Sequence, residues 1–114
     1  DGDLLATGCH DKRVRLFAVS SGQLTRTLVH GGRVYCVALR GAVLLSGGRD
    51  KTVKVWSVAE DVAAGQEHVA TLEGHEEPVR GVALAPSGPA RIVSVSRGGK
   101  LIVHEPATGA AALA

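Results

Sequence analysis

Three residues near the middle of the chain have the types of a serine-hydrolase triad: Ser46, His30 and Asp50. In such a triad the hydroxyl attacks an acyl carbon, the imidazole accepts its proton and the carboxylate orients the imidazole. The local signal of a nucleophile is missing, because no Gly-x-Ser-x-Gly sequence occurs and Ser46 follows Leu45. The residue types alone therefore do not predict hydrolysis, and a structural role is the alternative.

Cys9, His10 and Asp11 offer three possible metal ligands in a row. Zinc sites usually combine ligand pairs from separated segments, and no matching distant pair accompanies these three. A turn between strands explains the run better, so we expect no metal ion here. The glycine pairs of the chain lack the Lys and the Ser or Thr of a phosphate-binding loop, and we expect them to form turns. No cofactor is therefore expected.

The chain repeats a short pattern three times, in residues 6–17, 45–56 and 93–104. In each copy a hydroxyl residue precedes an aromatic residue or a histidine by ten positions; the pairs are Thr7 and Phe17, Ser46 and Trp56, Ser94 and His104. A second pattern, His followed four residues later by Val, lies upstream of two copies, at His30 and His75. Length differences are confined to connections, which is typical of a repeated strand unit.

Each repeat is expected to consist of short antiparallel strands. Residues 33–39, 42–46 and 52–56 alternate or run apolar, and glycines and Asp50 punctuate them at positions that suit tight turns. The more polar segments 68–72 and 23–28 are typical of outer edge strands. Residues 59–67 resemble a surface loop, with one helical turn at 58–64 as the alternative. The acidic run 60–77 is expected to be solvated. The sequence therefore predicts an all-β fold.

Composition excludes several classes of function. A net charge of +2 and an aromatic content of 3% argue against nucleic-acid binding. The longest apolar run, residues 34–39, is too short to cross a bilayer or to form a signal-peptide core. Two cysteines are too few for a disulfide scaffold, so we expect free thiols and an intracellular location, in the cytoplasm or nucleus.

Taken together, these motifs resemble the WD-repeat β-propeller family. The middle repeat carries nearly the whole pattern: His30, then Val34, then Ser-Gly-x-x-Asp-x-x-Val-x-Val-Trp ending at Trp56. Three departures stand out. Ser57 follows the Trp where the family has Asp, Phe17 and His104 replace the Trp in the flanking repeats, and Gly98 replaces the turn Asp in the third.

The resemblance implies a hydrogen-bonded tetrad in the middle blade. In it Trp56 donates to Ser46, the Ser46 hydroxyl bonds His30, and His30 bonds Asp50. This assignment replaces the hydrolase reading with a structural one. The flanking repeats keep partial tetrads, Thr7 and Asp11 in the first and His75 and Ser94 in the third, with His104 in the space of the Trp. We expect the third blade to be the loosest.

The predicted organisation is a partial WD repeat at 1–28 that lacks its first strand, a complete repeat at 29–72, and a degenerate repeat at 73–114. These units amount to about eleven strands, or two and three-quarter blades. Propellers close with typically 4–8 blades. We therefore expect a fragment of a longer protein, in which the remaining blades complete the ring.

The basic residues carry the functional hypothesis. In the family the turns between the second and third strands share one face of the ring. The hypothesis places partner-binding cations there, with a generic charged surface that favours solubility as the alternative; the residues are Arg49, Arg80, Arg97, Lys12 and Lys51. Residues 34–37 and 46–56 resemble repeats of F-box substrate receptors, which hold phosphorylated peptides with arginines. The predicted function is a non-catalytic protein-interaction scaffold. The alternatives are a phosphopeptide-reading ubiquitin-ligase receptor and a regulatory part of a larger catalytic polypeptide.

Overall fold

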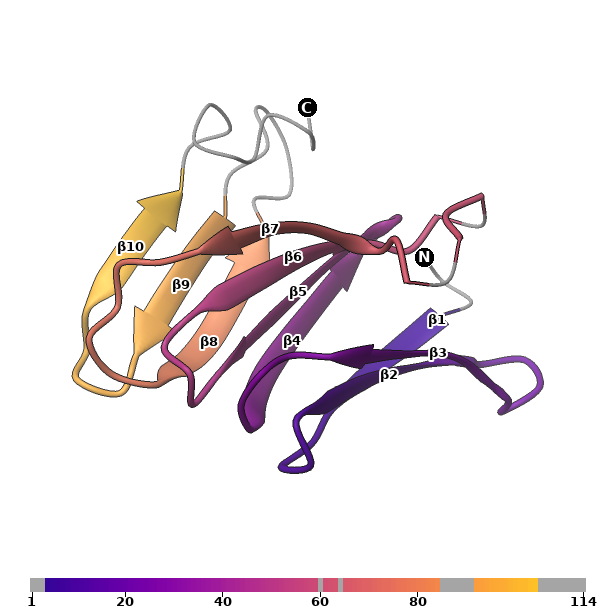
Figure 1. Ribbon diagram of the computed structural model, residues 1–114, viewed down its shortest axis with the longest axis horizontal. Coiled ribbons are helices and arrows are strands. Elements are labelled where there is room, and N and C mark those ends of the chain that lie inside the picture. Colours follow the sequence, from indigo (N-terminus) through magenta and orange to yellow (C-terminus); the bar gives the residue numbers. More distant parts are fainter. Residues whose placement is uncertain (1–3, 60, 64, 85–91, 105–114) are drawn as a thin grey trace.

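The described part of the chain forms three antiparallel β-sheets that lie face to face (Figure 1). The computed structural model describes residues 4–59, 61–63, 65–84 and 92–104. The first sheet contains β1 (Leu4–Gly8), β2 (Arg13–Ala18) and β3 (Leu24–Val29). The second contains β4 (Val34–Arg40), β5 (Val43–Gly48), β6 (Val53–Ser57) and β7 (His68–Leu72). The third contains β8 (Val79–Leu84), β9 (Ile92–Ser96) and β10 (Leu101–His104).

The all-β prediction is confirmed, and so is the arrangement in about three blades. Within each sheet, every strand pairs with the strand that follows it in the chain, so each sheet is an antiparallel meander. The eleventh predicted strand falls beyond His104, outside the described residues. The described part of 58–64 contains no helix; instead Val62 N–H donates to the Ala59 carbonyl at 3.0 Å, as in a turn. Within the described residues, no helix is long and apolar enough to cross a membrane.

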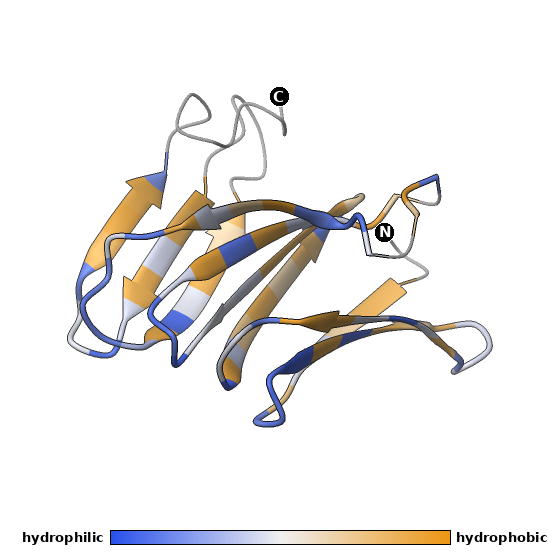
Figure 2. Cartoon of the chain, in the orientation of Figure 1, coloured by the Kyte–Doolittle hydropathy of each residue, from blue (hydrophilic) through white to orange (hydrophobic). Residues whose placement is uncertain are grey.

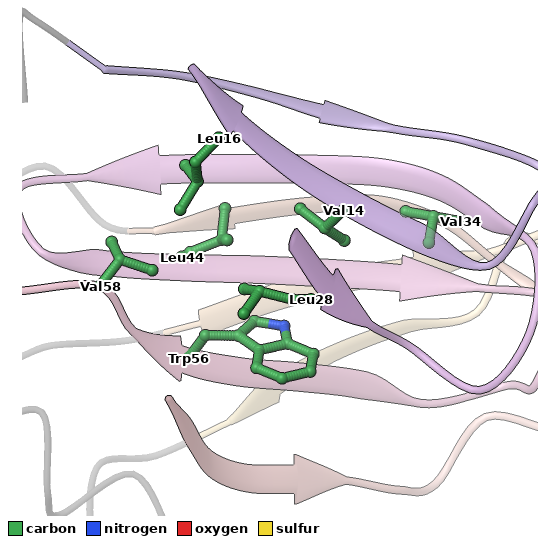
Figure 3. Close-up of a cluster of buried hydrophobic side chains, with 7 residues drawn as sticks. All are labelled: Val14, Leu16, Leu28, Val34, Leu44, Trp56 and Val58. Atoms are coloured by element: carbon green, nitrogen blue, oxygen red, sulfur yellow. The ribbon is translucent and has the colours of Figure 1, made fainter. Parts of the chain in front are cut away.

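The middle sheet is buried on both faces because β5 and β6 alternate their side chains between two cores. Leu44 and Trp56 face the first sheet, where they join Val14, Leu16 and others in one cluster (Figure 3). Leu45 faces the third sheet in a second cluster with Val53, Val55, Leu72, Val79 and Ile92. The period of two along each strand therefore supplies both interfaces between blades.

Two glycines on strands allow neighbouring blades to approach each other closely. A Cβ atom added to Gly47 would lie 2.6 Å from Cγ1 of Val79 and 2.8 Å from the sulfur of Cys36. A Cβ on Gly8 would lie 2.5 Å from Cγ1 of Val34. Gly8 and Gly47 hold the same repeat position. Each glycine thus lets the first strand of the following blade approach its own sheet.

The free edge of β1 borders a hollow. Among the described strands β1 pairs with β2 alone, and β4 of the next blade lies across from its other edge. A hollow of about 410 Å³ separates the two and is lined by residues of both strands, including Leu5, Val37 and Leu39. In the middle blade the corresponding place beside β5 is filled by β4. The edge of β1 that corresponds to the β4-paired edge of β5 therefore borders this hollow and is unpaired among the described strands.

Candidate functional site

The middle blade brings four polar side chains into one hydrogen-bonded chain. Nε1 of Trp56 lies 2.9 Å from Oγ of Ser46, and this oxygen lies 2.8 Å from Nδ1 of His30. Nε2 of His30 lies 2.9 Å from Oδ1 of Asp50. The same oxygen of Asp50 accepts bonds from the backbone N–H and hydroxyl of Thr52. The network links β5, β6, the turn between them and the loop before β4.

The direction of each bond follows from the groups at its two ends. The indole N–H of Trp56 can only donate, and the carboxylate of Asp50 accepts. The Ser46 hydroxyl therefore donates to Nδ1 of His30, and Nε2–H of His30 donates to Asp50. Burial lowers the pKa of His30 below its usual value, although the neighbouring Asp50 favours the charged ring. The neutral imidazole, which can both accept and donate, fits these positions.

The geometry leaves no room for hydrolysis at Ser46. Its side chain is fully buried at 0% exposure, and its oxygen already contacts both the indole and the imidazole. A catalytic serine must meet an acyl carbon from a cleft that opens to substrate. This constellation therefore stabilises the blade and offers no nucleophile to solvent.

The third blade builds a different network around a serine. Oγ of Ser94 lies 2.6 Å from Nε2 of His75 and 3.0 Å from Nε2 of His104. His104 is thus bonded to the serine in the position that Trp56 holds in the middle blade. Nδ1 of His75 is buried and has no hydrogen-bond partner among the described residues. Burial lowers the pKa of both His75 and His104.

The first blade has no comparable network among the described residues. Thr7 lies exposed on β1, opposite Arg15 of β2. Asp11 forms an ion pair with Arg15, whose Nη2 lies 2.6 Å from Oδ2, and it accepts the backbone N–H of Arg13 at 3.1 Å. The Arg15 guanidinium lowers the pKa of Asp11. The partial tetrad residues Thr7 and Asp11 are therefore not joined to each other in this structure.

The three turns between second and third strands lie at one end of the sheets, together with the loops before β4 and β8. We call this end the turn face; it comprises residues 9–12, 30–33, 49–51, 74–78 and 97–100. Backbone bonds hold it together: the N–H of Arg49 donates to the Arg33 carbonyl, and that of Arg97 to Pro78, at 2.8 and 2.9 Å. In Figure 2 these connections run along the lower edge and are largely hydrophilic.

The predicted partner-binding cations gather at the turn face or beside it. Arg49 and Arg97 are exposed at matching positions of their turns, and neither forms an ion pair with another described residue. Lys12 and Lys51 follow in the left-handed conformation, with φ of 74° and 70°. Arg80 is the second residue of β8, directly after Val79, at this end of the third sheet.

The sequence analysis did not single out Tyr35, which lies beside the turn face and contacts residues of both other blades. The guanidinium carbon of Arg80 lies 4.4 Å from the centroid of the Tyr35 ring, a cation–π contact between the second and third blades. The ring of His10 meets Tyr35 edge to face at 5.8 Å. The repeat pattern could have indicated this pair, because Tyr35 and Arg80 hold the same repeat position, directly after Val34 and Val79.

The sequence analysis also missed a partly buried ion pair near the end of the sheets opposite the turn face. Nη1 of Arg26 on β3 lies 2.8 Å from Oε2 of Glu67, and Nη2 donates to the carbonyls of Ala59 and Val62. Glu67 is buried, so the expectation of a fully solvated acidic run is wrong at this residue. Burial opposes the charge of Glu67, yet hydrogen bonds outweigh it and lower its pKa. The pair fastens the first blade to the 59–67 loop.

Both cysteines are free thiols in the structure. Burial raises the pKa of Cys36 to about 11, so its thiol stays protonated at neutral pH and packs as a small apolar group. Cys9 is exposed, while Asp11 is engaged by Arg15 and His10 by Tyr35. The described residues contain no group of three His, Cys, Asp or Glu side chains able to hold a metal ion.

The comparisons with known proteins agree with this architecture. The family described as "WD domain, G-beta repeat" matches residues 1–17, 22–57 and 66–105. The chain therefore belongs to the WD-repeat family. The computationally designed Ika4 protein has a similar fold, with a TM-score of 0.74 over 90% of this chain and 60% of that one, at 23% identity. The finer resemblance of the middle repeat to F-box receptors stays a prediction.

The related proteins have varied roles. The ribosome biogenesis protein WDR12 homolog of Chlamydomonas reinhardtii is 34% identical over 90% of this chain and 24% of its own length. A probable cytosolic iron-sulfur protein assembly protein 1 of Eremothecium gossypii is 37% identical over 75% of this chain and 28% of its own. Coronin-7 of Bos taurus is 30% identical over 93% of this chain and 12% of its own. The chain thus spans about a quarter or less of these relatives.

Proposed function

We propose that the chain is part of a non-catalytic WD-repeat scaffold that binds other proteins inside the cell. Its membership of the WD-repeat family supports this proposal, as do relatives whose names describe ribosome biogenesis and iron-sulfur protein assembly. The coverage of these relatives supports a longer protein in which further blades complete the ring. Function in such folds resides in the exposed loops and turns, so the partner must be sought there.

The turn face is the proposed binding surface, and its proposed ligand is a phosphorylated peptide. The observation that supports this most is the stack of Arg80 on Tyr35, with Arg49 exposed on the adjoining turn. The aromatic ring limits the freedom of the guanidinium, so less entropy is lost when a ligand binds it. Planar guanidinium groups suit phosphate because they donate two parallel hydrogen bonds.

The roles of the other cations follow from their positions. Lys12 and Lys51 are exposed on their turns, where charge acts through the general field. We expect them to influence the association rate and its salt dependence more than the lifetime of the complex. Arg97 holds the same repeat position as Arg49, but its surroundings differ.

The test is binding of the complete protein to matched phosphorylated and unphosphorylated peptide libraries. Arg49→Ala and Arg80→Ala should each weaken binding of phosphorylated peptides by about ten-fold, since a charge-assisted hydrogen bond contributes about 1.5–3 kcal/mol. Arg40→Ala is the matched control, because Arg40 ends β4 at the end away from the turn face. Equal affinity for both libraries would leave the scaffold proposal without its phosphate specificity.

A further inference from the structure

The two loops that enter the turn face differ in charge. The loop before β4 reads Gly31-Gly32-Arg33, and the loop before β8 reads Glu76-Glu77-Pro78 at the same repeat positions. Gly32 and Glu77 therefore correspond. The middle blade contributes only a cation from this loop, while the third blade contributes two carboxylates, so the two halves of the turn face cannot attract an anion equally.

A reciprocal exchange of acid and glycine accompanies this difference. In the middle blade the turn carries Asp50 and the loop carries Gly32, whose added Cβ would lie 3.1 Å from Cβ of Asp50. In the third blade the turn carries Gly98 and the loop carries Glu77. A Cβ on Gly98 would lie 2.7 Å from Oε2 of Glu77. The carboxylate of Glu77 thus occupies the space that a side chain at position 98 would fill.

The two acids differ in what they contact. Asp50 turns inward, where His30 and Thr52 donate to it, so its charge is satisfied within the blade. Glu77 is exposed, and no hydrogen bond or ion pair joins it to another described residue. Its carboxylate lies against Gly98, the residue after Arg97. The negative charge therefore faces solvent beside the arginine that the repeat pattern would offer to a ligand.

The side of the turn face formed by the middle blade carries no such exposed acid among its described residues. Arg33 and Arg49 are joined through their backbones, and Arg80 is held over Tyr35. The nearest turn acid of the first blade, Asp11, is already paired with Arg15. Three exposed arginines, Arg33, Arg49 and Arg80, therefore lie in or beside this part of the turn face.

We infer that the turn face has one phosphate subsite, formed by Arg33, Arg49 and Arg80, and that Glu77 excludes a second phosphate from Arg97. Glu77 is thus a specificity-determining residue that selects singly over doubly phosphorylated peptides. The inference rests on the proposed function, because it assigns the ligand of the same face. The reason is electrostatic, since the Glu77 carboxylate has the same sign of charge as a phosphate and opposes the attraction of that phosphate to Arg97.

The experiment compares singly and doubly phosphorylated peptides, with the two phosphoserines at varied spacing, on the complete protein. Glu77→Gln should raise the affinity for at least one doubly phosphorylated peptide about five-fold, and that for singly phosphorylated peptides less than about two-fold. Glu76→Gln is the control, since it removes the same charge from the same loop without touching the site of Gly98. The gain should shrink as salt is raised, because exposed charges are screened.

A second variant makes the role of Arg97 measurable. Arg97→Gln should change binding little in the natural protein and should abolish the gain in the Glu77→Gln background. Suppose that the natural protein binds singly phosphorylated peptides but Glu76→Gln and Glu77→Gln have equal effects. This result would overturn the role of Glu77 and leave the proposed function standing. Failure of every variant to prefer phosphorylated peptides would overturn the proposed function and this inference with it.

Discussion

The three residue types that suggest catalysis form a hydrogen-bond network here that stabilises the blade. A buried hydroxyl and a buried imidazole each lose water on folding, and an unpaired polar group costs about 1–3 kcal/mol. In the middle blade, Trp56 and Asp50 close the two ends of the chain of bonds. In the third blade, Nδ1 of His75 is left without a partner among the described residues. The third blade was expected to be the loosest because its sequence lacks the Asp and the Trp of the tetrad, and this stays a prediction.

The first prediction concerns His30. His30→Ala should destabilise the protein by about 1–3 kcal/mol, because it leaves both Ser46 and Asp50 without their shared partner. The measurement is denaturant unfolding of the complete protein, with His10→Ala as a control on an exposed imidazole that touches no tetrad residue. An unchanged midpoint for His30→Ala would contradict the structural role of the tetrad.

The second prediction concerns pH. Burial lowers the pKa values of His75 and His104, and the charges of Lys100 and His75 respectively add to this. Below a pH of about 6.5 the unfolded chain therefore binds more protons than the folded one, so stability falls as the pH is lowered. His104→Phe, which places the first repeat's residue type there, should make this fall shallower. Denaturant unfolding at pH 7.5 and 5.5 measures it, and an identical pH dependence of the variant would count against it.

At the scale of elements, the sequence predicted the strands of the middle repeat to within a residue or two. The reason is that alternation, glycine turns and the repeat itself all indicate the same boundaries. Predicted 52–56 became β6 at Val53–Ser57, and predicted 68–72 became β7 at His68–Leu72. Short-range chemistry decides these features, so a single sequence carries them.

What the sequence did not predict depends on contacts between blades. The Arg26–Glu67 ion pair joins residues 41 positions apart, and no local pattern marks a basic residue on a polar edge strand for burial. The Tyr35–Arg80 stack likewise requires knowing that β4 and β8 are neighbours. The order of blades was predictable, but the side chains that meet across them depend on rotamers and packing that periodicity does not encode.

The third prediction tests the close approach between blades. Gly47→Ala should cost about 1–3 kcal/mol, because the new methyl group would overlap Val79 and Cys36 at the interface of the second and third sheets. Gly81→Ala on β8 is the matched control, since a Cβ there meets nothing within 4 Å and its φ is not left-handed. Thermal unfolding of the two variants compares them directly; equal stability would mean that the interface can relax without cost.

At the scale of the molecule, one face of the third sheet is exposed, although the equivalent face of the middle sheet is buried. Val53 and Val55 on β6 are 0% exposed because the third sheet covers them. Their repeat equivalents on β10, Leu101 and Val103, are 59% and 46% exposed. The register of β10 against β9 places these residues on one face with Val93 and Val95. The outer face of the third sheet therefore exposes apolar side chains at positions that the middle sheet buries against its neighbour.

The last prediction follows from this face and its counterpart on the first sheet, where Leu5 and Val29 are exposed. Each blade of a repeat protein is stabilised chiefly by its neighbours, and both outer sheets here have a neighbour on one side. The 114-residue segment on its own should therefore bind a hydrophobic dye and self-associate, because large exposed apolar faces promote association. Leu101→Thr combined with Val103→Thr should reduce both effects, while Val19→Thr, at an exposed residue beyond β2, should not. Size-exclusion chromatography and dye fluorescence measure the outcome. A monomer that melts cooperatively and binds no dye would mean that three blades bury enough apolar surface to fold without the rest of a ring.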